Sequence, residues 1–108
     1  MEQVIQLARL CNYRVAHFRP ALTRSGHWMT PVQADGSGFP DLVLVRPPRG
    51  PIPGKVLFVE VKTDRGRVTR DQNFWALDLL AAGAEYHVWR PSMMPLIIKI
   101  LRGEEEAS

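Results

Sequence analysis

The sequence contains a single cysteine, Cys11, and no run of about 20 apolar residues of the kind that spans a bilayer. A lone cysteine excludes an internal disulfide and a cysteine-based zinc site, and it is typical of the reducing cytosol. The first residues also lack the basic, apolar and small-residue regions of a signal peptide. We therefore expect a soluble, cytoplasmic domain.

Internal repeats, low-complexity segments and an interdomain linker are absent as well, and 108 residues leave room for one domain. Apolar residues make up 45% of the chain, which is enough to form a core. We predict a folded domain over residues 1–102. The acidic tail at 103–108 is expected to be disordered, because chain ends with little apolar surface tend to fray.

Lysine is scarce: only 3 of the 14 basic residues are lysines, and the other 11 are arginines. The formal net charge is +3, but three of the acidic residues lie in the tail, so residues 1–102 carry +6. Arginine binds phosphate through a planar, bidentate guanidinium. The composition therefore favours an acidic polymer such as nucleic acid as the partner. A merely solvated basic surface is the alternative.

Apolar periodicity and turn residues predict one α/β domain. The expected elements are a helix over 2–11, a strand over 13–18, an irregular loop over 19–38, strands over 42–45 and 56–62, a helix over 69–82, a strand over 85–90 and a helix over 95–101. Because a proline- and glycine-rich turn joins the strands at 42–45 and 56–62, we expect these two to form an antiparallel hairpin.

Two charges interrupt the apolar strand at 56–62. Alternation places Glu60 and Lys62 on one face, at the C-terminal end of the strand. Charges at such a position are costly unless they pair or bind a ligand. A simple Glu60–Lys62 neighbour pair at a solvated strand end is the alternative.

A second carboxylate, Asp41, precedes the other strand of the hairpin and would lie across from Glu60. Two carboxylates repel each other unless a cation lies between them, and hard divalent ions such as Mg²⁺ prefer oxygen ligands. Taken alone, Asp41 could equally be a turn or capping residue after Pro40.

These motifs resemble a known nuclease signature. Pro40-Asp41, eighteen further residues and then Glu60-Val61-Lys62 are similar to the PD-(D/E)XK pattern, and more closely to its VRR-NUC (virus-type replication-repair nuclease) branch. The resemblance continues through Gln72 with its following aromatics and through residues 83–91, so that it covers residues 2–91. It implies a restriction-endonuclease-like core of order α-β-β-β-α-β, with a central mixed sheet flanked by helices and a short C-terminal helix.

The resemblance also implies roles for individual residues. Asp41, Glu60 and the backbone carbonyl of Val61 would bind Mg²⁺, for which Mn²⁺ would substitute. Lys62 would orient or deprotonate the attacking water and stabilise charge on the phosphate. Glu2, on the first helix, matches a carboxylate that helps to bind a second metal ion in many relatives.

Gln72 matches a polar family residue near the scissile phosphate. It also completes a capping box with Thr69, and this structural role would explain its presence without any catalytic one. The two roles are compatible, since a helix N-terminus is itself a site for anions.

Arg65, Arg67 and Arg70 flank the expected site and are our candidates for phosphate-backbone contacts, with a solvated charged loop as the alternative. Trp28, in the long loop, is a further candidate for contact with nucleic acid.

The function expected from this reading is that of a Mg²⁺-dependent endodeoxyribonuclease. By analogy with small relatives it would cut branched DNA such as Holliday junctions, act as a homodimer and work in a bacterial or phage-infected cell. The apolar run at 93–98 is a candidate dimer surface or a part of the core. Flap or nonspecific cleavage, a non-catalytic nucleic-acid-binding module, and a structural protein that binds a partner through the 19–38 loop remain alternatives.

Overall fold

The computed structural model describes residues 1–18, 21–22, 28–29 and 34–104, and of residues 21–22 and 28–29 it describes the backbone alone. The elements run in the order α1 (Glu2–Leu10), β1 (Arg14–His17), β2 (Ala21–Leu22), β3 (Trp28–Met29), β4 (Leu42–Arg46), β5 (Lys55–Val61), α2 (Arg70–Ala81), β6 (Glu85–Trp89), the 3-10 helix η1 (Pro91–Met93) and α3 (Met94–Arg102). The predicted order of helices and strands is confirmed. The region predicted as an irregular loop contains one additional short antiparallel pair, β2 and β3.

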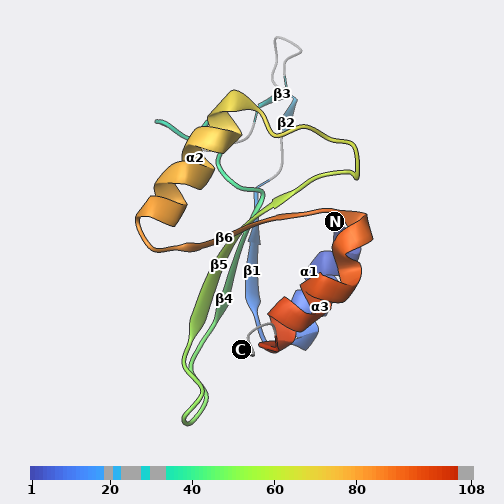
Figure 1. Ribbon diagram of the computed structural model, residues 1–108, viewed down its shortest axis with the longest axis vertical. Helices are drawn as coiled ribbons and strands as arrows, with labels where there is room; N and C mark the ends of the chain where they lie inside the picture. Colours follow the sequence, from blue (N-terminus) through green and yellow to red (C-terminus); the bar gives the residue numbers. More distant parts are fainter. Residues whose placement is uncertain (19–20, 23–27, 30–33, 105–108) are drawn as a thin grey trace.

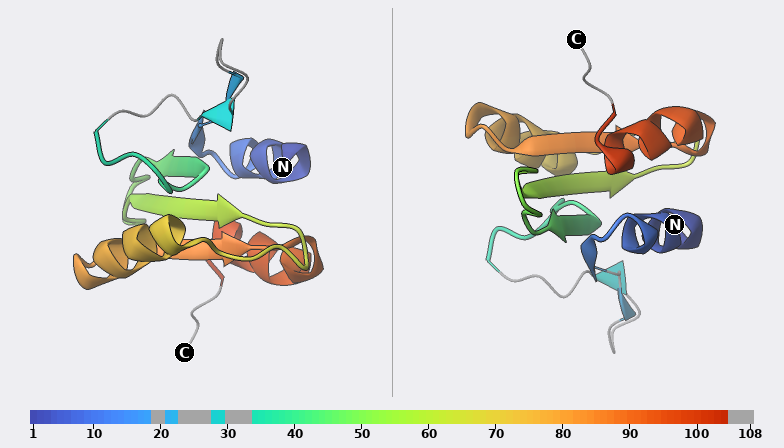
Figure 2. Two further views of the ribbon diagram at one scale, coloured as in Figure 1. Left: turned by 90° about the horizontal axis from the view of Figure 1, so that it is seen from above. Right: turned by 90° about the horizontal axis from the view of Figure 1, so that it is seen from below.

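Four strands form the main sheet in the spatial order β1-β4-β5-β6. The predicted hairpin is confirmed, because β4 pairs antiparallel with β5. Strand β6 returns through α2 and pairs parallel with β5, which makes the sheet mixed. Figure 2 shows β4, β5 and β6 side by side in this order.

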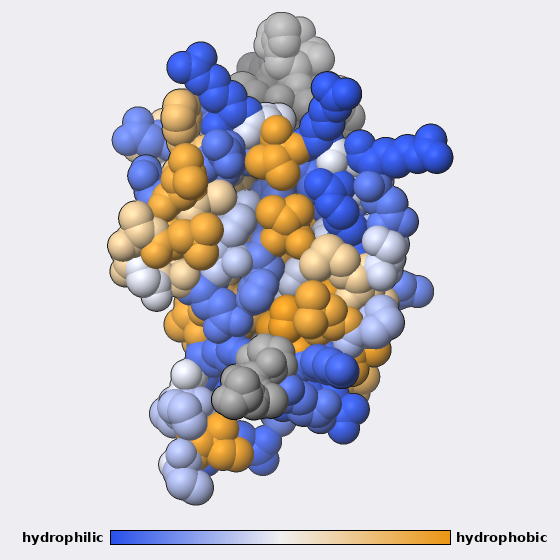
Figure 3. All heavy atoms as spheres, viewed as in Figure 1, coloured by the Kyte–Doolittle hydropathy of each residue, from blue (hydrophilic) through white to orange (hydrophobic). Residues whose placement is uncertain are grey.

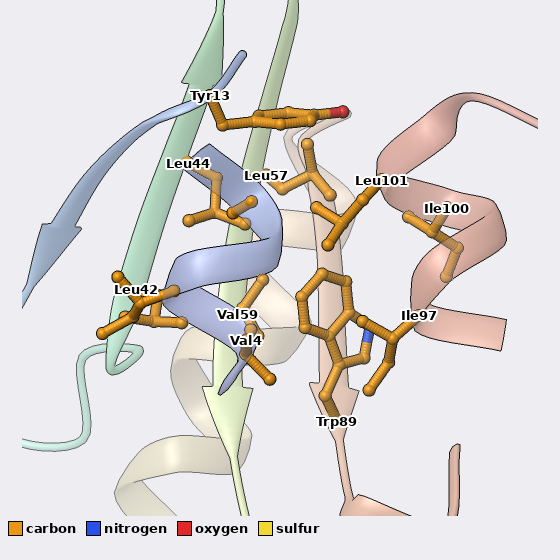
Figure 4. Close-up of a cluster of buried hydrophobic side chains, with 12 residues drawn as sticks. Val4, Tyr13, Leu42, Leu44, Leu57, Val59, Trp89, Ile97, Ile100 and Leu101 are labelled. Atoms are coloured by element: carbon orange, nitrogen blue, oxygen red, sulfur yellow. The ribbon is translucent and has the colours of Figure 1, made fainter. Parts of the chain in front are cut away.

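The core lies between one face of the sheet and the helices α1 and α3, which lie on the opposite side of the sheet from α2 (Figure 1). Strand alternation turns Leu57 and Val59 of β5 toward this core, where both are fully buried. Figure 4 shows their side chains meeting those of Trp89, Ile97 and the neighbouring strands and helices.

The other face of the sheet carries Phe58 and Glu60 and is partly covered by α2. This helix begins where sequence chemistry predicts: Thr69 is its N-cap and accepts a hydrogen bond from the backbone N–H of Gln72. The side chain of Gln72 accepts in return from the N–H of Thr69, so the predicted capping box is present. The helix ends at Ala81, with Ala82 as its C-cap, and Gly83 follows in the left-handed conformation at a φ of +86°.

The third helix ends at Arg102, and Gly103 follows it in the left-handed conformation that favours glycine. Residues 105–108 of the predicted acidic tail lie outside the described residues. Within the described part of the chain, no helix has both the length and the apolar character that crossing a membrane requires.

Candidate active site

The hairpin register brings the two predicted carboxylates together. Leu42 pairs with Val59, and the next position outward places Asp41 opposite Glu60. The Oδ2 atom of Asp41 accepts a hydrogen bond of 2.9 Å from the backbone N–H of Val61. Asp41 is therefore fixed against the end of β5.

The segment before β4 sets where Asp41 lies relative to α2. Gly38 has a φ of +82°, and a Cβ atom there would lie 2.5 Å from the backbone carbon of Asp71. Phe39 contacts Phe58 and Trp75 edge to face, with ring centroids 6.3 and 5.0 Å apart. A backbone approach this close allows only glycine, so Gly38 lets the segment pack against the start of α2.

Glu60 is almost wholly buried, with 2% of its surface exposed. Its Oε2 atom accepts a 2.9 Å hydrogen bond from Nε2 of Gln72 and lies 3.5 Å from Nζ of Lys62. Its Oε1 atom is also buried and has no hydrogen-bond partner within the described residues. A buried carboxylate oxygen without a partner is costly, and an occupied cation site would remove that cost.

Burial, followed by the nearby charge of Asp41, raises the pKa of Glu60 to about 7, and the ammonium of Lys62 opposes the shift. Two carboxylates at one site disfavour each other's ionisation. A divalent cation would reverse this effect, because it stabilises both charged forms. A bound cation would therefore remove the electrostatic penalty on ionised Glu60.

The side chain of Lys62 is 15% exposed and shares one face of the strand end with Glu60. The Glu60–Lys62 pair considered from the sequence is present, but it is largely buried rather than solvated. An ammonium in this position is a hydrogen-bond donor beside the carboxylates and carries the opposite charge.

The oxygen donors present are those that Mg²⁺ and Mn²⁺ accept: the Asp41 carboxylate just before β4, the Glu60 carboxylate on β5, and the backbone beside them at Val61. Within the described residues there is no cluster of three or more His, Cys, Asp and Glu side chains suited to a metal. The residues therefore fit a hard cation that keeps part of its water shell, since Mg²⁺ commonly uses only one or two carboxylates.

Gln72 has the predicted capping role and also contacts Glu60, while its place near a scissile phosphate stays a prediction. Its Oε1 accepts from the N-cap backbone of Thr69 while its Nε2 donates to Glu60. Both ends of the amide are therefore bound, and the start of α2 is tied to the buried carboxylate.

Two predicted site residues are not brought into this cluster. Glu2 is exposed on α1, and no described hydrogen bond or ion pair joins it to Asp41 or Glu60. Its assignment to a second metal ion stays a prediction. The backbone of Trp28 forms part of β3, but its side chain lies outside the described residues.

Arg65, Arg67 and Arg70 are exposed, in the connection after β5 and at the first position of α2. None of the three forms an ion pair within the described residues. The guanidinium of Arg70 lies 5.4 Å from the ring centre of Phe74. Exposed guanidinium groups without an acidic partner among the described residues are suited to phosphate.

Sequence reasoning missed Tyr86 and assigned no role to Arg90. Burial and the charges of Glu60 and Asp41 raise the pKa of Tyr86, which shares the Glu60 face of the sheet through its pairing with Phe58. Alternation along β6 predicts which residues share a face with Tyr86. Only the parallel pairing of β6 with β5 shows that this face is the one that carries Glu60.

Comparison with known proteins agrees with this geometry. The family described as the VRR-NUC domain matches residues 6–92, which include Asp41, Glu60, Lys62 and Gln72 and leave out Glu2. No curated protein and no solved structure gives a match. The family match covers most of the chain, and the predicted resemblance is confirmed: the chain belongs to the VRR-NUC family, and its domain is a nuclease domain of the PD-(D/E)XK type.

Proposed function

We propose that this domain is a Mg²⁺-dependent endonuclease that hydrolyses phosphodiester bonds in branched DNA. The observation that carries the proposal is the buried Glu60 carboxylate, which lies opposite Asp41 and has one oxygen without a partner among the residues that the structure describes. A protein that only bound DNA would gain nothing from two carboxylates facing phosphate, because their charges repel it.

Asp41, Glu60 and the carbonyl of Val61 would hold the ion. When bound, a divalent ion supplies Lewis-acid chemistry: it polarises a phosphate oxygen and lowers the pKa of water. Gln72 keeps the Glu60 carboxylate in place through the 2.9 Å hydrogen bond. Because the Glu60 carboxylate is held in advance, it does not have to be reoriented during the reaction.

Lys62 acts on the water and the phosphate. Its ammonium, 3.5 Å from Glu60, orients the attacking water and donates to the phosphate oxygen on which charge develops. The water oxygen gives up a proton and forms a new bond to phosphorus while one ester bond breaks. The leaving alkoxide takes up a proton and becomes a hydroxyl, and the other product is a phosphate monoester. The reaction needs no covalent enzyme intermediate.

DNA contacts in this proposal are made mainly to phosphate. Arg65, Arg67 and Arg70 are exposed beside the site, and arginines that contact the backbone read DNA shape rather than base sequence. Selection by shape fits a branched substrate, whose backbones follow paths that a linear duplex does not offer.

A homodimer would suit a four-way junction, because both can have twofold symmetry. The run at 93–98 offers little dimer surface, because Ile97 is buried and Met93 and Met94 pack against the core, although Leu96 is exposed. Helix α2 offers a better one. Figure 3 shows apolar side chains gathered over it, where Phe74 and Leu77 are 50% and 56% exposed. We place the twofold contact on this face of α2.

The test is cleavage of end-labelled four-way junctions and linear duplexes of the same sequence, with Mg²⁺, Mn²⁺ or EDTA. Wild type should cut junctions faster and only with metal, while Lys62→Ala should bind but not cut. Equal cleavage rates on junctions and linear duplexes would show that the enzyme does not select branched DNA. Binding without cleavage by wild type would overturn the nuclease proposal in favour of a binding module.

The dimer has a separate test. Sedimentation of wild type should give a dimer at working concentration, and Leu77→Glu should give a monomer. The matched control Leu96→Glu changes an exposed leucine on α3 and should leave the dimer intact. A wild type that is monomeric and fully active would contradict the homodimer.

A further inference from the structure

The turn that follows the catalytic strand folds back on Lys62. The backbone N–H of Lys62 donates to the carbonyl of Trp89 at 2.9 Å, and this is the last sheet-like bond on that strand. Directly afterwards, the N–H of Gly66 donates to the carbonyl of Thr63 at 3.1 Å and closes a tight turn.

Gly66 lies against the side chain of Lys62. A Cβ atom on Gly66 would be 3.5 Å from Cδ of Lys62 and 3.0 Å from Oγ1 of Thr63. The turn therefore packs beside the aliphatic part of the Lys62 side chain. The position of the turn limits where the Lys62 ammonium can lie.

Arg90, the residue after β6, holds this turn from the other side. Its Nη1 donates to the carbonyls of Thr63 and Gly66, both at 2.7 Å, and lies 3.4 Å from that of Asp64. Within the described residues no carboxylate lies close enough to Arg90 to form an ion pair. Its guanidinium is thus directed at backbone carbonyls rather than at an acidic partner.

A second contact joins the same two segments. The backbone N–H of Ser92 donates to Oδ1 of Asp64 at 3.0 Å, which lowers the pKa of Asp64. The turn at 63–66 is thereby attached to the end of β6 by two side chains, one from each segment. We call this set of contacts the Arg90 clip.

We propose that Arg90 is a positioning residue for cleavage: it holds the 63–66 turn against Lys62 and so fixes the Lys62 ammonium beside Glu60. The inference rests on the proposed nuclease function. Arg90 itself touches neither Glu60 nor Asp41 in the described contacts, and it acts on the reaction only through the turn. At metal sites, the loss of a hydrogen bond that orients a ligand commonly lowers metal affinity or activity by roughly 10–100-fold, and we take the same scale for the positioning of Lys62.

The first experiment measures steady-state cleavage and DNA binding by wild type, Arg90→Ala and Arg90→Lys. We expect kcat to fall roughly 10–100-fold in Arg90→Ala, with KM and DNA affinity in EDTA within about threefold of wild type. Arg90→Lys should keep part of the activity, since an ammonium can still donate to a carbonyl. Millimolar guanidinium ion should restore cleavage to Arg90→Ala and not to Lys62→Ala.

Arg102→Ala is the matched control, because Arg102 is exposed, pairs with Glu104 and lies at the end of α3. It should cleave like wild type. An unchanged kcat in Arg90→Ala would overturn the inference. So would a parallel loss of kcat and DNA affinity, or a loss explained by the unfolded fraction in a melting curve.

A readout independent of cleavage is hydrogen exchange of the Gly66 amide. In Arg90→Ala this amide should exchange faster, because the carbonyls of the turn have lost their donor, while amides of α1 stay protected. Unchanged Gly66 exchange would show that Arg90 does not hold the turn. If wild type failed to cleave any DNA, the proposed function would fail, and the exchange experiment would still decide whether the clip exists.

Discussion

Glu60→Gln should make the metal-free protein more stable while it removes metal binding. The pKa of Glu60 is raised from 4.5 to about 7 by burial and by the charge of Asp41. A carboxyl whose pKa is higher in the folded state contributes stability when protonated, below the unfolded value, and loses it as pH rises through the folded value. At alkaline pH the folded protein therefore holds an unfavourable charge.

The loss of folding stability caused by ionised Glu60 follows from the size of its pKa shift. Each pKa unit corresponds to about 1.36 kcal/mol, so a shift from 4.5 to about 7 costs wild type about 3 kcal/mol at pH 8.5. At pH 5 most of the folded-state carboxyl is protonated, and the cost falls below about 1 kcal/mol. Glutamine resembles the protonated acid in shape and can still accept the hydrogen bond from Gln72.

The assay is urea unfolding of wild type and Glu60→Gln in EDTA at pH 5 and pH 8.5. The variant should exceed wild type by about 3 kcal/mol at pH 8.5 and by less than about 1 kcal/mol at pH 5. Added Mg²⁺ should narrow the gap at pH 8.5, because only wild type gains binding energy. A variant equal to or less stable than wild type at pH 8.5 would refute the reasoning on Glu60.

Three further changes test the surroundings of the site. Gly38→Ala should destabilise the fold by about 3 kcal/mol or more in urea unfolding, since its Cβ would meet the backbone of Asp71 at 2.5 Å; a change below about 1 kcal/mol would contradict the close approach. Thr69→Ala should cost about 1 kcal/mol through loss of the helix cap, whereas Thr69→Ser should cost little. Arg67→Ala should lower the slope of log K for DNA against log salt by about 1 and leave the rate at saturating DNA unchanged; an unchanged slope would remove Arg67 from the interface.

Much of the fold was predictable because it depends on local patterns. The capping box set the start of α2, and the proline- and glycine-rich turn predicted the β4–β5 hairpin. The hairpin then predicted that Asp41 lies opposite Glu60, because the apolar pattern of the two strands and the turn between them set the antiparallel register. This pairing is the part of the site that the sequence could supply.

The rest depends on contacts between distant segments. Periodicity does not say that β6 lies beside β5, and so it gave no reason to connect Arg90 with the turn after Lys62. The bond from Gln72 to Glu60 likewise requires knowing how far α2 lies above the sheet. Helix α2 also exposes apolar side chains such as Leu77, and no pattern in the sequence tells that face from the buried one.

The central claim is that Asp41 and Glu60 together hold a divalent cation. Calorimetric titration with Mn²⁺ at pH 8 tests it most directly, because it needs neither DNA nor cleavage. Binding should be present in wild type and in Lys62→Ala, and lost in both Asp41→Asn and Glu60→Gln, with all four proteins folded by circular dichroism. Undiminished Mn²⁺ binding by Glu60→Gln would contradict the claim.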